Sequence, residues 1–321
     1  MTLATPLATT PAMTSPHALR VACVQFDLKP VGSYGEFAQR VLAWALAAKD
    51  GGVQLLLFPE YFTLPLLALG DVDRPIERQV YALAERADEV LGTLREAASA
   101  AGLWIAGGST PVLPHRVPAL REHPHLVGRA ANACPLVSPS GAVAWQAKLH
   151  MTRFEAEHWG VISHPPLRVF DTPLGRLAVL ICYDVEFPEL ARAVARAGAQ
   201  VLLVPSCTED RPGFLRVRTC AAARAIENQC YVLHAPTVGW LWSVPTAALH
   251  YGQASVLGPS DLGFARDGIL AEGPLGVESL VVADLDLALL DRVRDRGTVR
   301  TLRDSAGSDA LAATLTSESL A

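Results

Sequence analysis

The chain has 321 residues, of which 50% are hydrophobic and 18% are charged. A chain of this length and composition can bury a large core, which favours one large α/β domain over two small ones. The formal net charge is −5, and the Lys and Arg residues are scattered without forming runs. This charge pattern argues against nucleic acid and anionic membranes as partners.

The apolar runs, the N-terminal segment and the cysteines indicate in which cellular compartment the protein is expected. No apolar stretch reaches the roughly 18 residues that a membrane-spanning helix needs, which predicts a soluble protein. Residues 1–18 are rich in Thr, Pro and Ala but lack the basic start and apolar middle of a secretory signal, so we expect a disordered tail. The six cysteines are widely spaced and form no CxxC pair. This spacing favours free thiols in a reducing cytoplasm over a cysteine metal site, and no cofactor is indicated.

In the first half of the chain, apolar runs alternate with segments of helical period, a pattern typical of layered α/β proteins. We expect strands at 19–26, 53–58 and 103–109, and helices at 34–49 and 77–101 that end at glycines. Residues 111–129 contain four prolines and three histidines without a period, which indicates an irregular loop. A Pro-Ser-Gly turn between 131–138 and 142–148 predicts a β-hairpin.

The second half repeats the alternation of strands and helices. We expect helices that end near 197 and 228, and strands at 177–182, 200–204, 231–234, 253–257, 269–272 and 279–284. No linker divides the chain, so residues 19–297 are interpreted as one domain. From Thr298 the composition turns polar and small, and we expect the 298–321 tail to be disordered or packed on a partner subunit.

The segment 180–190 carries the first candidate for chemistry. An apolar strand ends directly at Cys182, and a helix is predicted a few residues later, with Pro188 suited to its first turn. A thiol in such a bend lies close to backbone N–H groups, which favour a thiolate and can donate to an oxyanion. Because most cysteines at random positions are core residues, this setting alone is modest support for a nucleophile.

Two further charged residues follow predicted strands. Glu60 lies just beyond the apolar run 55–58, and a partly desolvated glutamate near a thiol can act as a general base. Lys148 ends the second strand of the hairpin, where a fixed ammonium can stabilise a thiolate or a tetrahedral oxyanion. Either residue alone is as well explained by a solvated surface charge, so their combination with Cys182 is what counts.

In the order Glu60, Lys148, Cys182, these segments resemble the catalytic signature of the nitrilase superfamily of carbon–nitrogen hydrolases. The similarity extends from 21–25 to 281–285 and includes the run Arg-Ala-Ile-Glu-Asn-Gln at 224–229. The resemblance implies an α/β fold, the four-layer αββα sandwich of that superfamily. It also implies a hydrolase of non-peptide carbon–nitrogen bonds.

The resemblance assigns roles to individual residues. It implies that Glu60 is the general base, Cys182 the nucleophile, and Lys148 the oxyanion stabiliser, assisted by the backbone N–H of Tyr183. Many members carry a second glutamate between the Lys and the Cys. Glu157 is the best match for that position, and Glu155 is the alternative.

Two departures from the superfamily pattern are present. His164-Pro165 stands where a Pro-Gly is common, so the alignment around the second glutamate is open. Glu186 occupies the position of a common Arg after the nucleophile, which points to a little-characterised subgroup.

The expected reaction is hydrolysis of a small amide or ω-amide through an acyl-thioester on Cys182. Tyr183 stands where nitrilases in the narrow sense often carry Trp, which favours an amide over a nitrile; nitrile and N-carbamoyl hydrolysis remain alternatives. Residues expected to follow strand ends and line the pocket are Thr152, Phe154, Trp159, Cys207 and Thr208.

Three competing readings use other features. A papain-like hydrolase needs a histidine paired with Cys182, and no local pattern supports one. A metal hydrolase would use His115, His123 and His125, which lie in the proline-rich loop. A binding homologue without catalysis would be marked by loss of Glu60, Lys148 or Cys182, and all three are present.

The resemblance also implies a homodimer or higher homo-oligomer. The helices expected at 187–197 and 214–228 would form the interface, and the C-terminal tail would cross to the partner.

Overall fold

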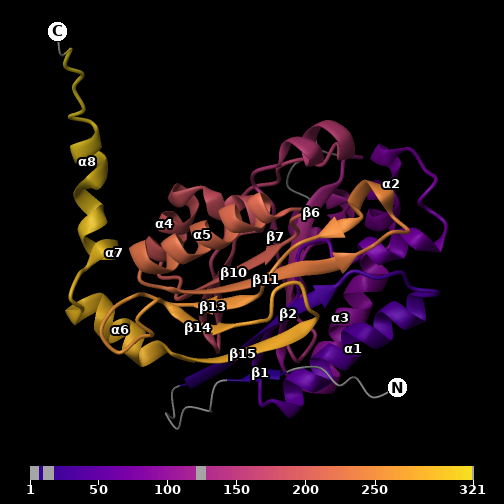
Figure 1. Ribbon diagram of the computed structural model, residues 1–321, viewed down its shortest axis with the longest axis horizontal. Helices are drawn as coiled ribbons and strands as arrows, with labels where there is room; N and C mark the ends of the chain where they lie inside the picture. Colours follow the sequence, from indigo (N-terminus) through magenta and orange to yellow (C-terminus); the bar gives the residue numbers. More distant parts are fainter. Residues whose placement is uncertain (1–6, 10–17, 121–127, 320–321) are drawn as a thin grey trace.

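The computed structural model describes residues 7–9, 18–120 and 128–319 of the chain. Two β-sheets lie face to face in the middle, and helices cover both outer faces (Figure 1). Helices α1 (Tyr34–Asp50) and α3 (Ala87–Ala101) cover one sheet, and α4 (Pro188–Arg196) and α5 (Arg211–Glu227) cover the other. The expected four-layer αββα sandwich is confirmed.

The first sheet is built around the long strand β2 (Ala18–Asp27). Strand β2 pairs in parallel with β3 (Leu55–Leu57) on one side and antiparallel with β15 (Ser279–Asp286) on the other. Strand β3 in turn pairs in parallel with β4 (Trp104–Ala106). The remaining strands of this sheet are β1 (Leu7–Thr9), β5 (Thr110–Val112), β6 (Ala131–Val137) and β7 (Val143–Ala147). Strands β6 and β7 form the predicted hairpin.

The second sheet contains β8 (Phe170–Thr172), β9 (Gly175–Val179), β10 (Val201–Ser206), β11 (Tyr231–Trp240), β13 (Ser255–Leu257) and β14 (Ile269–Glu272). Strands β9, β10 and β11 are parallel neighbours. The last residues of β11 also pair with Phe26 and Asp27 at the end of β2. This contact joins the two sheets at one corner.

The alternation of side chains along β2 explains the layering. Ala22, Val24 and Phe26 pack in the apolar cluster that contains α1 and α3, whereas Val21 and Cys23 point into the cluster shared with the second sheet. All five side chains are fully buried. A strand segment covered on both faces must be apolar throughout, which is why residues 21–24 of β2 and all of β3 are continuous apolar runs.

The helix expected at 77–101 is two helices, α2 (Ile76–Glu85) and α3. Arg86, with φ −88° and ψ 0°, ends the first and begins the second. Neither Gly nor Pro marks the break, and the apolar period continues on both sides of it. A sequence pattern therefore cannot distinguish this bend from one long helix.

The expected loop 111–129 is partly ordered structure. It contributes to β5 and forms short helical turns at Pro114–Arg116 and Pro118–Leu120, while residues 121–127 lie outside the described part of the chain. Strands β8 and β12 (Leu249–His250) and helix α6 (Leu287–Arg296) were not expected. The two strands are three and two residues long, too short to show a period.

The two tails contain more structure than their composition suggests. Within the N-terminal tail, Leu7–Thr9 pair with β15, and β2 begins at Ala18; the other residues of 1–17 lie outside the described part of the chain. The C-terminal tail contains α7 (Thr301–Asp304) and α8 (Ser308–Ala312). Arg196 of α4 donates to the Ser305 carbonyl oxygen at 2.6 Å, and α8 projects away from the sandwich (Figure 1). In the described chain, no helix combines the length and apolarity that crossing a membrane requires.

Gly108 offers a test of the packing between the ends of β3 and β4. Its φ of +61° is left-handed, and a Cβ at this position would clash with the Pro59 carbonyl oxygen. We therefore expect Gly108→Ala to lower the free energy of unfolding by about 2–4 kcal/mol in denaturant titrations. Gly92, in helix α3 with open space around it, is the matched control, and Gly92→Ala should not destabilise the fold. Equal stability of both variants would contradict this account of Gly108.

Candidate active site

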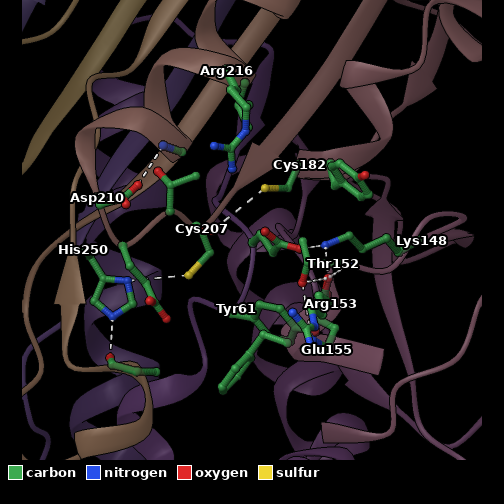
Figure 2. A pocket seen from close by; sticks show the side chains of 18 of the residues that line it. Tyr61, Lys148, Thr152, Arg153, Glu155, Cys182, Cys207, Asp210, Arg216 and His250 are labelled. Atoms are coloured by element: carbon green, nitrogen blue, oxygen red, sulfur yellow. Dashed lines mark hydrogen bonds and ion pairs between the residues drawn. The ribbon is translucent and has the colours of Figure 1, made fainter. Parts of the chain in front are cut away.

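Glu60, Lys148 and Cys182 all follow the ends of strands and meet in one cavity. Glu60 comes three residues after β3, Lys148 directly after β7, and Cys182 three residues after β9. All three line a cavity of about 660 Å³. Figure 2 shows this cavity with Lys148 and Cys182 labelled. The first two come from one sheet and Cys182 comes from the other, so the cavity lies where the two sheets meet.

Lys148 is the most buried charged group of this site. Its side chain is 1% exposed, and Nζ donates to Glu60 Oε1 at 2.8 Å and to Glu155 Oε2 at 2.7 Å. The two carboxylates raise the pKa of Lys148 well above its ordinary value despite the opposing effect of burial. The ammonium therefore stays charged, and its third N–H is not engaged by either carboxylate.

One carboxylate oxygen of Glu60 accepts hydrogen bonds from two buried donors. Oε1 accepts from Lys148 Nζ and, at 2.9 Å, from Asn132 Nδ2. Burial raises the pKa of Glu60 to about 7, while Lys148 and the Cys182 side chain act in the opposite direction. A carboxyl with this pKa can both accept and return a proton near neutral pH.

Cys182 begins a short helical turn, Cys182–Glu186, and its backbone is strained. Its φ is +48°, a left-handed value that residues other than Gly rarely adopt. The thiol is 4% exposed, and Sγ lies 3.9 Å from the Cys207 carbonyl oxygen. Burial first, and then the negative charge of Glu60, raise the pKa of Cys182 well above its ordinary value. The resting group is thus a thiol that needs a base, although the N–H groups of the bend favour a thiolate.

The structure corrects the expectation for the second glutamate. Glu155 is 3% exposed and contacts Lys148, whereas Glu157 lies at the surface and pairs with Arg153 at 2.9 Å. Both belong to one helical turn, Glu155–Trp159, whose buried residues are Glu155 and Trp159. Residues four apart, here Glu155 and Trp159, share a face of such a turn, and the residue midway between them, Glu157, points away from Lys148.

Glu155 is fixed by Tyr61, which the sequence did not single out, and by Thr152, which was expected only as a pocket residue. Tyr61 Oη donates to its Oε1 at 2.8 Å, and the backbone N–H and hydroxyl of Thr152 donate to its Oε2, each at 2.9 Å. Lys148 and these donors lower the pKa of Glu155 against the effect of burial. Tyr61 directly follows Glu60, and Asn132 is the polar residue of an apolar strand, so both left a weak signal in the sequence.

The five residues expected to line the pocket, Thr152, Phe154, Trp159, Cys207 and Thr208, all line this cavity. Tyr61, Phe154 and Trp159 form an aromatic cluster. The ring centroid of Trp159 lies 5.0 Å from that of Tyr61 and 5.1 Å from that of Phe154. Tyr183 also lines the cavity and packs edge to face on Phe187. The cavity therefore combines aromatic walls with the charged cluster around Lys148.

A histidine also lines the cavity, but it does not contact the nucleophile candidate. His250 Nδ1 lies 3.5 Å from Cys207 Sγ, and Nε2 donates to the Ala247 carbonyl oxygen at 2.7 Å (Figure 2). Burial lowers the pKa of His250 to about 4, so the ring is neutral. The papain-like reading requires a histidine on Cys182, and this geometry does not provide it.

The metal reading receives no support from the described residues. Within 7–9, 18–120 and 128–319, no group of three or more His, Cys, Asp or Glu side chains is arranged to hold a metal ion. His115 lies in the turn Pro114–Arg116, and His123 and His125 lie outside the described residues. All six cysteines are free thiols.

The remaining charged residues of the cavity lining come in both signs. Arg216 lies 3.6 Å from Glu186, the residue that departs from the superfamily pattern, and Asp210 caps α5 by accepting from the Gly213 N–H. Glu209 is exposed at the edge of the cavity, where partial desolvation together with Asp210 raises its pKa. A polar or charged end group on a substrate would thus meet charged partners.

Comparisons with known proteins identify the family and the fold. A model of the carbon–nitrogen hydrolase family matches residues 20–295. The probable hydrolase YhcX of Bacillus subtilis is 37% identical over 293 residues, which cover 90% of this chain and 54% of YhcX. The chain thus spans about half the length of that relative. The omega-amidase NIT2 of Xenopus tropicalis is 26% identical over 88% of this chain and 94% of the relative.

Solved structures show the same fold. A double mutant of the amidase from Nesterenkonia sp. AN1, in complex with acrylamide, is 26% identical with a TM-score of 0.68, covering 88% of this chain and 99% of that one. Nit3 of Saccharomyces cerevisiae, a member of branch 10 of the nitrilase superfamily, has a TM-score of 0.70 at 24% identity, covering 89% of this chain and 96% of that one.

The pKa values predict how Cys182 reacts with pH. Below about 7 Glu60 is protonated and cannot accept the thiol proton, and above it the carboxylate can. The rate of Cys182 alkylation by iodoacetamide, followed by peptide mass spectrometry, should therefore rise with pH with a midpoint near 7. In Glu60→Gln this midpoint should disappear. A wild-type midpoint near that of an ordinary thiol, about 8.5, would contradict the assignment.

Proposed function

Because the chain belongs to the carbon–nitrogen hydrolase family, we propose that it hydrolyses a small amide through an acyl-thioester on Cys182. The observation that carries this proposal is the convergence of Cys182, Glu60 and a fully buried, charged Lys148 in one cavity. A buried ammonium between carboxylates and beside a thiol is costly for a purely structural core. Such groups cluster at catalytic sites.

In the first half-reaction, Glu60 takes the thiol proton as Cys182 Sγ attacks the amide carbonyl carbon. This formulation follows from the raised pKa of the thiol and the pKa of Glu60 near 7. The tetrahedral intermediate then collapses, the carbon–nitrogen bond breaks, and the Glu60 proton leaves on the amine. The product that stays behind is the acyl-thioester on Cys182.

In the second half-reaction, Glu60 accepts a proton from water as the water oxygen attacks the thioester carbonyl. Collapse of this intermediate breaks the carbon–sulfur bond, and Glu60 returns the proton to Cys182 Sγ. The acid is released and the thiol is restored. One carboxyl thus serves both steps without a net change in its protonation.

The oxyanion of each intermediate needs donors that are fixed before the reaction. The N–H of Lys148 that neither Glu60 nor Glu155 accepts would supply one, and the backbone N–H of Tyr183 a second. Glu155, and not Glu157, would act as the second glutamate, because its contact with Lys148 Nζ at 2.7 Å orients the ammonium.

The relatives suggest where to look for the substrate. NIT2 is named an omega-amidase, and the Nesterenkonia enzyme is an amidase solved with acrylamide. A cavity of about 660 Å³ has room for an acyl group larger than that of acrylamide. Arg216 and Glu209 would meet a charged end group, so amides with polar acyl groups are the favoured class. Nitrile and N-carbamoyl compounds are the alternatives to test beside them.

Variants of the central residues test the proposal. Cys182→Ala should lower amide turnover by at least about 10³-fold, and Glu60→Gln by about 10²–10⁴-fold, with both proteins folded by circular dichroism. Glu155→Gln should also lose activity, because Lys148 would lose one of its two carboxylates. Glu157→Gln is the matched surface control and should stay within about twofold of wild type.

The assay is ammonia release from a panel of amides, ω-amides, N-carbamoyl compounds and nitriles, with Cys182→Ala as the blank. The ω-amides should be paired with neutral and amine-bearing amides of equal length, so that the end group is the only variable. Activity should withstand a chelator and be lost on thiol alkylation. Full activity of Cys182→Ala or Glu60→Gln would exclude the mechanism, and a panel without turnover would favour a non-catalytic binding homologue.

We also propose a homodimer in the cytoplasm, formed through the outer faces of α4 and α5. Leu215 and Ile226 on α5 expose 39% and 44% of their surface, and a partner helix packed on α5 would cover both side chains. Light scattering after gel filtration should give twice the chain mass of 34.2 kDa. Leu215→Glu with Ile226→Glu should shift the protein to monomer, whereas a wild-type monomer would refute the dimer.

A further inference from the structure

The turn that carries Cys182 is held from outside. A left-handed residue other than Gly persists only where the surroundings over-determine its conformation. At Cys182 the φ is +48°, and the residues that follow it, Tyr183 to Glu186, complete a single turn. The groups that hold this turn therefore decide where the Cys182 thiol points.

Asp184 ties the turn to the segment that follows Lys148. Its side chain is 1% exposed, and its carboxylate accepts from the backbone N–H groups of Ile181 at 3.3 Å, Leu149 at 3.2 Å and His150 at 2.8 Å. Ile181 directly precedes the nucleophile, and Leu149 directly follows the buried lysine. One carboxylate thus sets the distance between Cys182 and Lys148.

The charge of Asp184 is needed for these bonds. Burial raises its pKa to about 6, and Lys148 and the backbone donors oppose this effect, so the group is ionised at neutral pH. An ionised carboxylate has acceptor sites for all three N–H groups. An asparagine would place an NH₂ donor against at least one backbone N–H.

Arg224 holds the other end of the same turn. It comes from α5, is 6% exposed, and donates from Nε to the Val185 carbonyl oxygen at 2.9 Å and from Nη2 to the Glu186 carbonyl oxygen at 3.0 Å. Its remaining nitrogen donates to Glu227 at 2.9 Å. The planar fork of Arg suits two acceptors at once, which a lysine ammonium cannot reproduce.

We propose that Asp184 and Arg224 are positioning residues that hold Cys182 in its strained conformation and keep Lys148 against Glu60. Neither side chain lines the cavity, so both act through the groups they hold. Two motif residues noted in the sequence thereby gain a physical role: Arg224, the first residue of the run at 224–229, and Asp184, which follows Cys182 and Tyr183.

Asp184→Asn is the first test. We expect kcat for the best amide of the panel to fall about 100-fold with KM within about threefold, since a misplacement near 1 Å costs about this much. The pH midpoint of Cys182 alkylation should also rise by about one unit, because a displaced Lys148 no longer lowers the pKa of Glu60. If only the negative charge of Asp184 were lost, the pKa of Glu60 and the midpoint would fall, because a nearby negative charge disfavours a second carboxylate. A rise in the midpoint therefore indicates a displaced Lys148 and not the missing charge.

Two further variants separate positioning from general stability. Asp284→Asn removes another buried carboxylate, one that accepts two bonds from Arg20 at 3.0 and 2.9 Å outside the cavity, and it should lower stability while keeping kcat and the midpoint. Arg224→Lys keeps the charge but loses the fork, and it should lower kcat in the same manner as Asp184→Asn. It also gives a result if Asp184→Asn does not fold.

The inference rests on the proposed role of Cys182, and the wild-type alkylation profile tests that role separately. If wild-type Cys182 shows no midpoint near 7, the proposed function fails. If the wild-type profile has its midpoint near 7, the positioning role is tested by Asp184→Asn and Arg224→Lys. A folded variant of either kind that keeps the kcat and the alkylation midpoint of the wild type would overturn that role. A matched loss of kcat in Asp284→Asn would reduce the effect to stability and overturn it equally.

Discussion

The site depends on an ammonium group buried between two carboxylates. Removing Lys148 from water costs several kcal/mol, and only close contact with Glu60 and Glu155 offsets that cost. The same contacts set the chemistry, because two carboxylates and one ammonium leave an excess negative charge beside Cys182. Burial and the charge of Glu60 keep the thiol protonated, and burial raises the pKa of Glu60 to about 7 against the opposing effect of Lys148. The same contacts of Lys148 with Glu60 and Glu155 therefore compensate the buried charge and set the acid–base properties of the site.

The sandwich brings these groups together because each sheet contributes strand ends to the same corner. Glu60 and Lys148 follow β3 and β7 of one sheet, and Cys182 and Cys207 follow β9 and β10 of the other. The pairing of β2 with β11 fixes the two sheets relative to each other. Backbone strain accompanies this meeting, since Tyr61 and Cys182 both have positive φ. The residues that hold the strained turns, such as Asp184, lie behind the cavity and not in it.

Much of the fold could be read from the sequence, because long buried strands and amphipathic helices leave regular patterns. Strand β2, helix α1 and the hairpin of β6 and β7 were expected close to their observed bounds. The break at Arg86 was not, since the apolar period runs through it. Strands β8 and β12 are too short to show alternation and exist only because a neighbour supplies hydrogen bonds. The helical C-terminal tail was missed because its residues are exposed and carry no apolar stripe.

The sequence by itself determined Glu60, Lys148 and Cys182 as the candidates, because each stands at a strand end within a motif whose order is specific. It also placed Thr152, Trp159 and Cys207 near them. Only the tertiary structure decided between Glu155 and Glu157, since the choice depends on which face of one helical turn points inward. Asn132 contacts Glu60 across 72 residues of sequence, and Tyr61 contacts Glu155 across 94, so only the fold brings these pairs together, as it brings His250 to the cavity. Motifs are local in the chain, whereas burial and charge compensation depend on which distant segments meet. For this reason the sequence identified the candidate reacting groups, and the structure identified the residues that contact them.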